Sequence, residues 1–238
     1  MAFSQRFWTE YPRDVVQVAG ADALTYLQSQ LSQDLRPVQV GQSVWSFVLQ
    51  PTGKLDVLLR VWRTDDDTFV LDTDEGFGEV LVARLNRFKI RVKADITALD
   101  WKCVAVRGAS KVPADALVAW GQGYDLLGAD VRPPAGVEQG TAEDLLASRI
   151  DAVWPQMGAE ITPGETIPAE TSISAVAVSF TKGCYPGQEL VERMDSRGAT
   201  APKLLQRVVL GDGEPVGTIT SRSGSVALAY VKRSALQA

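Results

Sequence analysis

Residues 182–189 read KGCYPGQE and place a lysine, a cysteine, a tyrosine and a glutamate within one short stretch. Two glycines and a proline interrupt it, which is typical of a tight loop with exposed backbone amides. Cys184 is one of only two cysteines in the chain. The following residues, QELVERM, predict a helix with Glu189 in its first turn, where a carboxylate is favourable.

Cys184 allows two interpretations. An unpaired cysteine is most often a small side chain packed in a turn, and chemistry alone favours that interpretation. Alternatively, Lys182 lies two positions away, and a nearby cation favours the thiolate, which is the reactive form of cysteine. The second cysteine, Cys103, lies in an alternating apolar run and is predicted to be a core residue.

Composition places the chain among ordinary globular proteins. Its 238 residues are 45% hydrophobic and 22% charged, which is enough for one large domain or two to three small ones. The net charge of −5 and pI near 4.9 lack the basic character of a nucleic-acid binder, so no direct DNA binding is expected. No apolar run approaches a membrane span or a signal-peptide core, so we expect a cytoplasmic protein without membrane contact.

The absence of histidine limits the possible chemistry. A chain without histidine has no Ser-His-Asp or Cys-His catalysis and no histidine metal ligand. Two cysteines alone cannot complete a four-ligand zinc or iron–sulfur site, so no metal site is predicted. Chemistry would therefore depend on carboxylates, lysine, tyrosine, cysteine or a bound cofactor.

The first part of the chain predicts an α+β layer. Helical spacing of apolar residues alternates with β-rich runs, and a Pro/Gly turn at 51–53 joins two of those runs as a hairpin. We expect antiparallel strands with helices packed on one face. The predicted elements are a helix at 21–35, strands at 43–50, 54–63 and 68–72, a helix at 77–88 and a strand at 91–96.

The second part predicts a further α+β unit. Thr141 and Asp144 have the spacing of a capping pair that would open a helix over 141–150. Residues 151–175 are rich in Pro, Gly and Thr and predict an irregular connection. The remaining expected elements are a strand at 101–108, a short helix at 113–120 and three short strands within 204–231.

Several stretches together resemble one family. VSFTKGCYPGQELVERMDSRG resembles the signature of the YgfZ branch of the aminomethyltransferase superfamily, in which Lys-Gly-Cys-Tyr-x-Gly-Gln-Glu precedes an arginine and an Arg-Gly. The resemblance covers nearly the whole chain, and this signature is its most specific part. The other matching stretches are VAGADALTYLQSQLSQDL, LQPTGKLDVLLRVWR, LNRFKIRVKADI and EPVGTITSRSGSVALAYV.

The resemblance implies a fold and a cofactor. Members of the superfamily form a pseudo-trefoil of α+β subdomains around a central hole that holds tetrahydrofolate or a one-carbon derivative. The short remainder after Ala201 implies a truncated C-terminal β-barrel or hairpin, which puts the closure of the hole in question. The expected units are an N-terminal folate-binding subdomain at 1–98, a second subdomain and connection at 99–175, the signature loop and helix at 176–200, and a C-terminal β subdomain at 201–238.

The resemblance also implies site residues, each with a plainer alternative. Cys184 would be the reactive thiol, and Lys182 would steady the thiolate or an anionic ligand instead of being a solvated charge. The residues that would contact folate otherwise serve packing, helix ends or the surface. They are Tyr185 stacking on a flat ring, Gln188 and Glu189 in polar contact, Arg193 and Arg197 meeting a glutamate tail, and Arg149 at the pterin.

Three functions remain open from the sequence. The favoured one is a folate-dependent accessory protein for iron–sulfur cluster assembly or repair, whose partners are iron–sulfur client proteins or carriers, including enzymes that modify tRNA. The second is a non-catalytic module that lost the ligand. The third, a tetrahydrofolate-dependent aminomethyl or methyl transferase, requires a catalytic aspartate where alignment finds Glu79, which is better interpreted as a first-turn helix residue. Whether the protein is an enzyme is left open.

Overall fold

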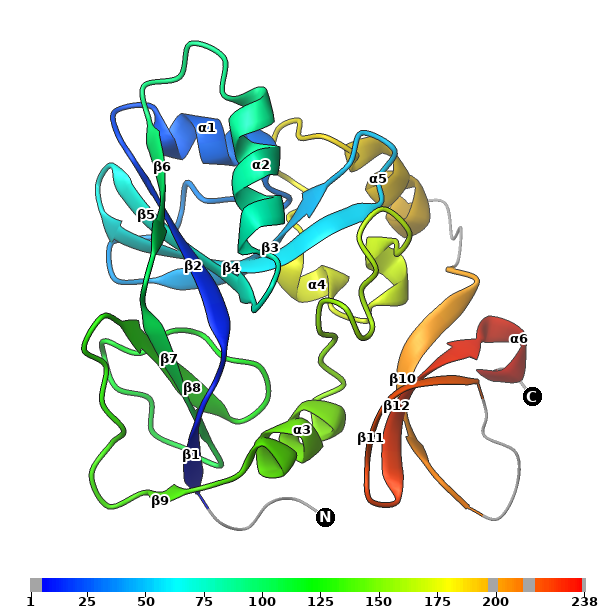
Figure 1. Cartoon of the computed structure of the whole chain (residues 1–238). Coiled ribbons are helices and arrows are strands. Elements are labelled where there is room, and N and C mark those ends of the chain that lie inside the picture. Colours follow the sequence, from blue (N-terminus) through cyan, green and yellow to red (C-terminus); the bar gives the residue numbers. More distant parts are fainter. Residues whose placement is uncertain (1–5, 197–200, 212–216, 237–238) are drawn as a thin grey trace.

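The first sheet forms the upper part of the molecule (Figure 1). A computed structural model describes residues 6–196, 201–211 and 217–236. The first sheet is antiparallel with strand order β3-β4-β5-β2-β6, and helices α1 and α2 lie on one of its faces. The bounds are β2 (Arg13–Ala19), α1 (Ala23–Gln30), β3 (Ser43–Leu49), β4 (Leu55–Asp65), β5 (Thr68–Asp74), α2 (Gly78–Phe88) and β6 (Asp95–Leu99).

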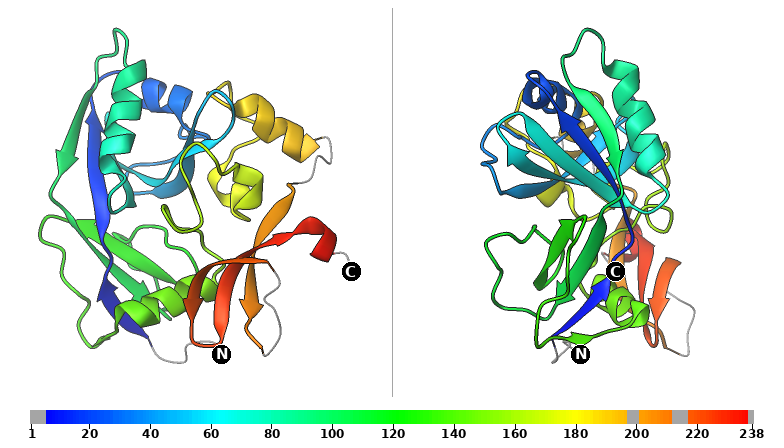
Figure 2. Two further views of the ribbon diagram at one scale, coloured as in Figure 1. Left: turned by 45° about the vertical axis from the view of Figure 1, so that its right-hand side comes forward. Right: turned by 60° about the vertical axis from the view of Figure 1, so that its left-hand side comes forward.

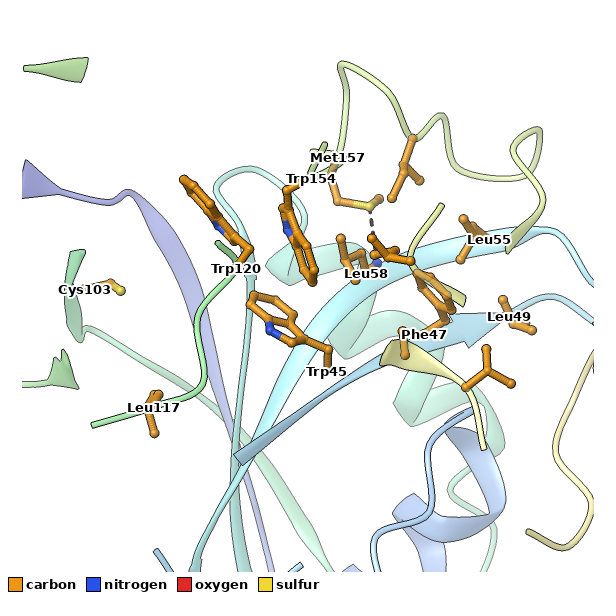
Figure 3. Packing of buried hydrophobic residues seen from close by; sticks show 14 of the residues in the cluster. Trp45, Phe47, Leu49, Leu55, Leu58, Cys103, Leu117, Trp120, Trp154 and Met157 are labelled. Carbon is orange, nitrogen blue, oxygen red and sulfur yellow. Dashed lines mark hydrogen bonds between the residues drawn. The ribbon is translucent and has the colours of Figure 1, made fainter. Parts of the chain in front are cut away.

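Both faces of this sheet are buried. One face packs under α1 and α2 through Leu27, Leu81 and Leu85. The opposite face packs against the chain that follows the second sheet, where Trp45 and Trp154 lie with ring centroids 4.7 Å apart (Figure 3). Burial on two sides explains why β4 is apolar over most of its length instead of alternating.

One of the two inner strands of the second sheet, β1, comes from the N-terminal part of the chain. Its order is β8-β7-β1-β9, with β1 antiparallel to β7 and parallel to β9. The first strand of the unit expected at 1–98 therefore lies in the second sheet, while the following strands lie in the first. The bounds are β1 (Phe7–Glu10), β7 (Lys102–Arg107), β8 (Gly123–Gly128) and β9 (Glu138–Gln139), followed by α3 (Ala142–Asp151).

The connection after α3 returns to the first sheet. It contains the 3-10 turn η1 (Pro168–Glu170) and the short helix α4 (Ser174–Ala177), and it leads into α5 (Gln188–Ser196). Both views in Figure 2 place this segment against the hairpin of β3 and β4. The irregular connection expected over 151–175 is therefore correct in kind, apart from these short helical turns.

The C-terminal region forms an open sheet in the described residues. β10 (Lys203–Val209), β12 (Val226–Lys232) and β11 (Thr218–Ser223) pair antiparallel in that order, and α6 (Arg233–Leu236) follows. Leu205, Leu228 and Tyr230 pack with Ile150 of α3, which joins this sheet to the second unit. Within the described part of this region the strands do not close into a barrel. This agrees with the truncated C-terminal β-barrel or hairpin expected from the sequence.

Most expected elements are present, and four details are wrong. α1 ends at Gln30, well before the predicted end of the helix, and β6 begins four residues late. The helical spacing of apolar residues over 77–88 also predicts Val80 on the same face as Leu81 and Leu85, but Val80 is exposed whereas the two leucines are buried. Residues 113–120 are not helical, because Leu117 forms a β-bridge with Asp125 and nearby backbone groups bond to side chains of the first sheet.

The predicted start of α3 is confirmed. The Thr141 side chain accepts from the backbone N–H of Asp144, and the Asp144 carboxylate accepts from the backbone N–H of Thr141. This capping box satisfies two amides that the helix itself cannot. In the part of the chain that the structure describes, no helix is both long enough and apolar enough to cross a membrane.

Candidate functional site

The signature loop, residues 182–189, is pressed against the turn between β3 and β4. Gly187 and Gly53 both have φ of +83°, a conformation that favours glycine. A Cβ on Gly187 would lie 2.5 Å from the carbonyl oxygen of Gln50, and a Cβ on Gly53 would lie 2.4 Å from the Cβ of Leu190. The two Gly-containing stretches noted in the sequence therefore pack backbone to backbone, which fixes the path of the loop.

The side chain of Lys182, the first residue of the loop, is buried against the C-terminal end of helix α1. Its ammonium nitrogen donates to the backbone carbonyls of Gln28 (2.6 Å), Leu31 (2.5 Å) and Gln33 (3.1 Å). A cation at the carbonyl end of a helix is favourable, and these contacts explain why α1 is short. Burial lowers the pKa of Lys182 to about 8.

This anchoring changes the expected role of Lys182. An ammonium has three N–H donors, and here each has a backbone acceptor. In this arrangement none is left for the sulfur of Cys184. Steadying a thiolate would require Lys182 to leave the end of α1, so that role stays a prediction.

The other predicted residues of the loop divide between core and surface. Cys184 is exposed, whereas Tyr185 is buried with its ring centroid 5.1 Å from the Lys182 ammonium. Burial and Glu192 raise the pKa of Tyr185 to about 12. A buried ring in contact with Lys182 has little surface for stacking on a ligand, so that role also stays a prediction.

Helix α5 carries the remaining residues of this group. The side-chain amide nitrogen of Gln188 donates to the carboxylate of Glu192, one turn later, at a distance of 2.5 Å. Glu189 and Arg193 are exposed on the same helix. Arg197 lies outside the described residues. The structure therefore brings Lys182 and Tyr185 together and leaves the predicted polar contacts of α5 facing solvent.

Arg149 lies in a different part of the molecule, near the end of α3 (Figure 1). It is buried, and it donates to the Trp154 carbonyl (2.9 Å), to Glu160 (2.7 Å) and to the hydroxyl of Ser221 (2.5 Å). These contacts join α3, the connection and the C-terminal sheet. Arg149 also lines a cavity, so the proposed pterin contact stays a prediction.

Three adjoining cavities form a cleft along α3 and the second sheet. The first, about 520 Å³, and the second, about 250 Å³, share Tyr11, Pro12 and Glu75. The third, about 200 Å³, shares Trp120 with the second. We call these three cavities the central cleft. The tryptophans on its walls are Trp8, Trp101 and Trp120.

A buried chain of charges, which sequence analysis missed, lies beside the cleft. Asp72 accepts from Arg13 (2.8 Å) and from Arg60 (2.9 Å). Asp125 accepts from Arg60 and from Arg107, both at 2.7 Å. The available signal was the presence of arginine and aspartate inside otherwise apolar β-strands, where a charge needs a partner.

One further carboxylate, that of Asp74, extends the chain of charges towards Tyr11, which lines the cleft. Asp74 pairs with Arg13, and it accepts from the backbone N–H of Met157 (3.0 Å) and the hydroxyl of Tyr11 (3.2 Å). Burial opposes ionisation of Asp125, but Arg107 and Arg60 outweigh it and lower its pKa. Asp125 therefore stays charged, and the buried carboxylates together fix three arginines in place. We call Arg13, Arg60, Arg107, Asp72, Asp74 and Asp125 the charge chain.

Cys103 is buried, whereas Cys184 is exposed. It lies in β7 within the apolar cluster, as predicted, and it is buried (Figure 3). Burial, together with Asp125, raises the pKa of the Cys103 thiol to about 12. Across the described residues, no group of three or more cysteine, aspartate or glutamate side chains has the arrangement of a metal site.

Comparison with known proteins shows which proteins the chain resembles. No family model matches the chain. It is 28% identical to a Haemophilus influenzae protein described as uncharacterized, over 80% of this chain and 68% of that one. It is 26% identical to the tRNA-modifying protein YgfZ of Vibrio vulnificus, over 77% of this chain and 64% of that one. The iron–sulfur cluster assembly factor IBA57 homolog of Mycosarcoma maydis is 27% identical, over 81% and 54%.

A solved structure shows the same fold. The glycine cleavage system aminomethyltransferase T from Bartonella henselae matches with a TM-score of 0.72 and 16% identity, over 97% of this chain and 79% of that one. The chain is similar in sequence to YgfZ-type proteins and has the fold of an aminomethyltransferase. It spans about two thirds of the length of the YgfZ protein and about half of the IBA57 homolog.

Proposed function

We propose that this YgfZ-type protein binds tetrahydrofolate, or a one-carbon derivative of it, and assists iron–sulfur cluster assembly or repair in client enzymes. Clients that modify tRNA fit the names of its relatives, which include a tRNA-modifying protein and a cluster assembly factor. The observation that carries the proposal is the exposed thiol of Cys184 on a loop that Gly187 and Lys182 hold in place. A fixed, accessible thiol suits transient contact with a partner.

The central cleft fits a folate. Cavities for small molecules are commonly about 300–1,000 Å³ and largely apolar with a few polar groups. The central cleft offers that space, with the partly exposed rings of Trp8 and Trp101 as flat surfaces and Arg149 and Glu75 on its walls. Aromatic walls suit a planar pterin ring. Bound there, folate would supply a one-carbon carrier, and the chain's residues would orient it.

The single exposed thiol defines how Cys184 can act. One cysteine cannot hold a stable cluster, because iron–sulfur clusters need several thiolate ligands. The client or a carrier must therefore supply the other ligands, and Cys184 adds one contact during the exchange. The cluster is cargo in this scheme, not a resident cofactor.

The position of Glu79 makes a one-carbon transferase the weaker proposal. Such an enzyme needs a carboxylate close to the reacting folate nitrogen. Glu79 is exposed in the first turn of α2 and does not line any of the three cavities of the central cleft. Its position suits the helix N-terminus better than proton transfer in the cleft.

Folate binding is tested by calorimetric titration of the purified protein with tetrahydrofolate under anaerobic, reducing conditions. We expect saturable one-to-one binding and a large loss of affinity in Trp101→Ala, because the variant removes a partly exposed aromatic wall. Glu79→Gln is the control and should bind as the wild type does. Absence of binding at millimolar tetrahydrofolate would overturn the cofactor assignment.

The role of Cys184 is tested separately. Cys184→Ser should keep tetrahydrofolate affinity but fail to restore a tRNA-modifying iron–sulfur enzyme in a host that lacks its own protein of this family. Cys103→Ala is the matched control, because it removes the buried thiol and leaves the exposed one. Restoration by Cys184→Ser at wild-type protein levels would exclude the thiol from the function.

A further inference from the structure

Arg107, at the end of β7, has an unused hydrogen-bonding edge. The side chain is almost completely buried, and its Nη1 donates to Asp125 (2.7 Å) and to the carbonyls of Val106 (3.1 Å) and Tyr124 (3.2 Å). Its Nε and Nη2 atoms are buried without a hydrogen-bond partner. Buried donors normally have partners, so an unpaired pair of N–H groups indicates a missing acceptor.

The two unpaired donors lie on one edge of the guanidinium. Nε and Nη2 point their N–H bonds in nearly parallel directions, and this fork matches the two oxygens of a carboxylate. The Trp120 ring centroid lies 3.9 Å from the guanidinium carbon, which holds the plane of the group in place. Asp125 fixes the other edge. The fork is therefore preorganised for a bidentate acceptor.

The third cavity of the central cleft provides the space for that acceptor. Arg107 and Trp120 line it together with Gln122 and Ser148, and its volume is about 200 Å³. Asp151 also lines it, but its carboxylate pairs with Arg207 at 2.7 Å. The negative charge on the wall is thus balanced by a cation, whereas the two buried donors of Arg107 beside this cavity have no hydrogen-bond partner among the described residues.

We propose that Arg107 and Trp120 form a subsite for the carboxylate group of a small organic ligand. A carboxylate suits the site better than phosphate, because its two oxygens match the two donors, whereas a phosphate dianion would leave oxygens and charge uncompensated. The second cavity, which shares Trp120 with the third, is the nearest further space for the ligand body. The carboxylate comes either from the glutamate tail of a folate, which rests on the proposed function, or from a free dicarboxylate.

The test compares ligands with and without the carboxylate. Wild-type protein is titrated with tetrahydrofolate, with tetrahydropteroate, which lacks the glutamate tail, and with glutarate as a free dicarboxylate. If the tail binds Arg107, tetrahydrofolate should bind at least about tenfold more tightly than tetrahydropteroate. If the ligand is a free dicarboxylate, glutarate should bind on its own, and the two pterins should bind alike or not at all.

Arg107→Lys should abolish whichever of the two results the wild type shows, the tighter binding of tetrahydrofolate than of tetrahydropteroate or the binding of glutarate. Lysine keeps the charge beside Asp125 but lacks the fork. The variant's circular dichroism and melting curve are compared with those of the wild type to establish that it folds. Gln122→Glu adds a carboxylate to the exposed rim without touching the charge chain and should weaken the same ligand, whereas Gln39→Glu adds the same charge away from the cleft and should not.

The outcomes separate this subsite from the proposed function. Equal affinity for tetrahydrofolate and tetrahydropteroate without glutarate binding would overturn the subsite and leave folate binding intact. Glutarate binding that depends on Arg107, without binding of either pterin, would support the subsite and overturn the folate proposal. Failure of all three ligands to bind would overturn both the subsite and the folate proposal. Inorganic phosphate is titrated as a comparison, and tighter binding of phosphate than of glutarate would overturn the carboxylate assignment.

Discussion

The signature loop and the charge chain both bury cations beside a cysteine, but they solve the problem in opposite ways. The charge chain neutralises Arg60 and Arg107 with carboxylates. The loop surrounds Lys182 with backbone carbonyls, which carry only partial charge. At Arg60 the carboxylates of Asp72 and Asp125 outweigh burial and raise the pKa, whereas at Lys182 burial outweighs its surroundings and lowers the pKa.

The cysteines follow the same division. Cys103, beside the charge chain, is enclosed by the apolar cluster, and Cys184 stands on the surface of a loop anchored from below. The interior region thus encloses its thiol, and the loop leaves its thiol exposed to solvent. Three measurements sharpen or break this comparison.

The largest expected difference is in the alkylation of the two cysteines. Iodoacetamide should label Cys184 at least about 1,000-fold faster than Cys103 in the native protein, because Cys103 reacts only after an opening that costs roughly 5 kcal/mol or more. Mass spectrometry of timed samples measures both rates. Cys184→Ala isolates the slow rate of Cys103. Equal protection of the two thiols would remove the contrast between the regions.

The next largest effect is on stability. Asp125→Asn should lower the free energy of unfolding by about 3–5 kcal/mol, because it leaves Arg60 and Arg107 buried next to each other without their shared carboxylate. Urea unfolding measures the change. Asp130→Asn, at an exposed turn after β8, is the control and should change stability by less than about 0.5 kcal/mol. A shift in Asp125→Asn no larger than that of the control would show that the charge chain does not hold the interior.

Local signals in the sequence predicted the elements whose cause is local. The capping pair of Thr141 and Asp144, the hairpin around Gly53 and the helix from Gln188 depend on residues a few positions apart, and each is present. The helix expected at 113–120 failed because Arg60 and Ser43 bond to Val118 from another sheet. Such long-range contacts override propensity and leave no local pattern.

The site divides along the same line. The sequence predicts Cys184 as a site residue and shows the two glycine turns, but it could not show that the hydrogen-bond partners of Lys182 lie about 150 positions earlier in the chain. The charge chain joins residues from β2, β4, β5, β7 and β8, and only the three-dimensional pairing shows which arginine meets which aspartate. The unpaired fork of Arg107 follows from that pairing, so no sequence pattern announces it.

The smallest expected effect is the pH dependence that Lys182 adds to stability. Native Lys182 releases its proton near pH 8, whereas the unfolded chain keeps it until about pH 10.5. Between these values the unfolded state binds more protons, so stability rises with pH. Relative to Lys182→Met, which has no titrating group here, the wild type should therefore gain stability from pH 8 to pH 10, on the order of 1 kcal/mol after solvent screening.

Urea unfolding of both proteins at a series of pH values measures that gain. Lys54→Met, at an exposed position in the neighbouring turn, supplies the baseline for removing a lysine. The comparison of the two regions depends on the sign. If the wild type instead lost stability against Lys182→Met as the pH rose through this window, the ammonium would be stabilised in the folded state. The carbonyls at the end of α1 would then stabilise a buried cation no less effectively than the carboxylates of the charge chain.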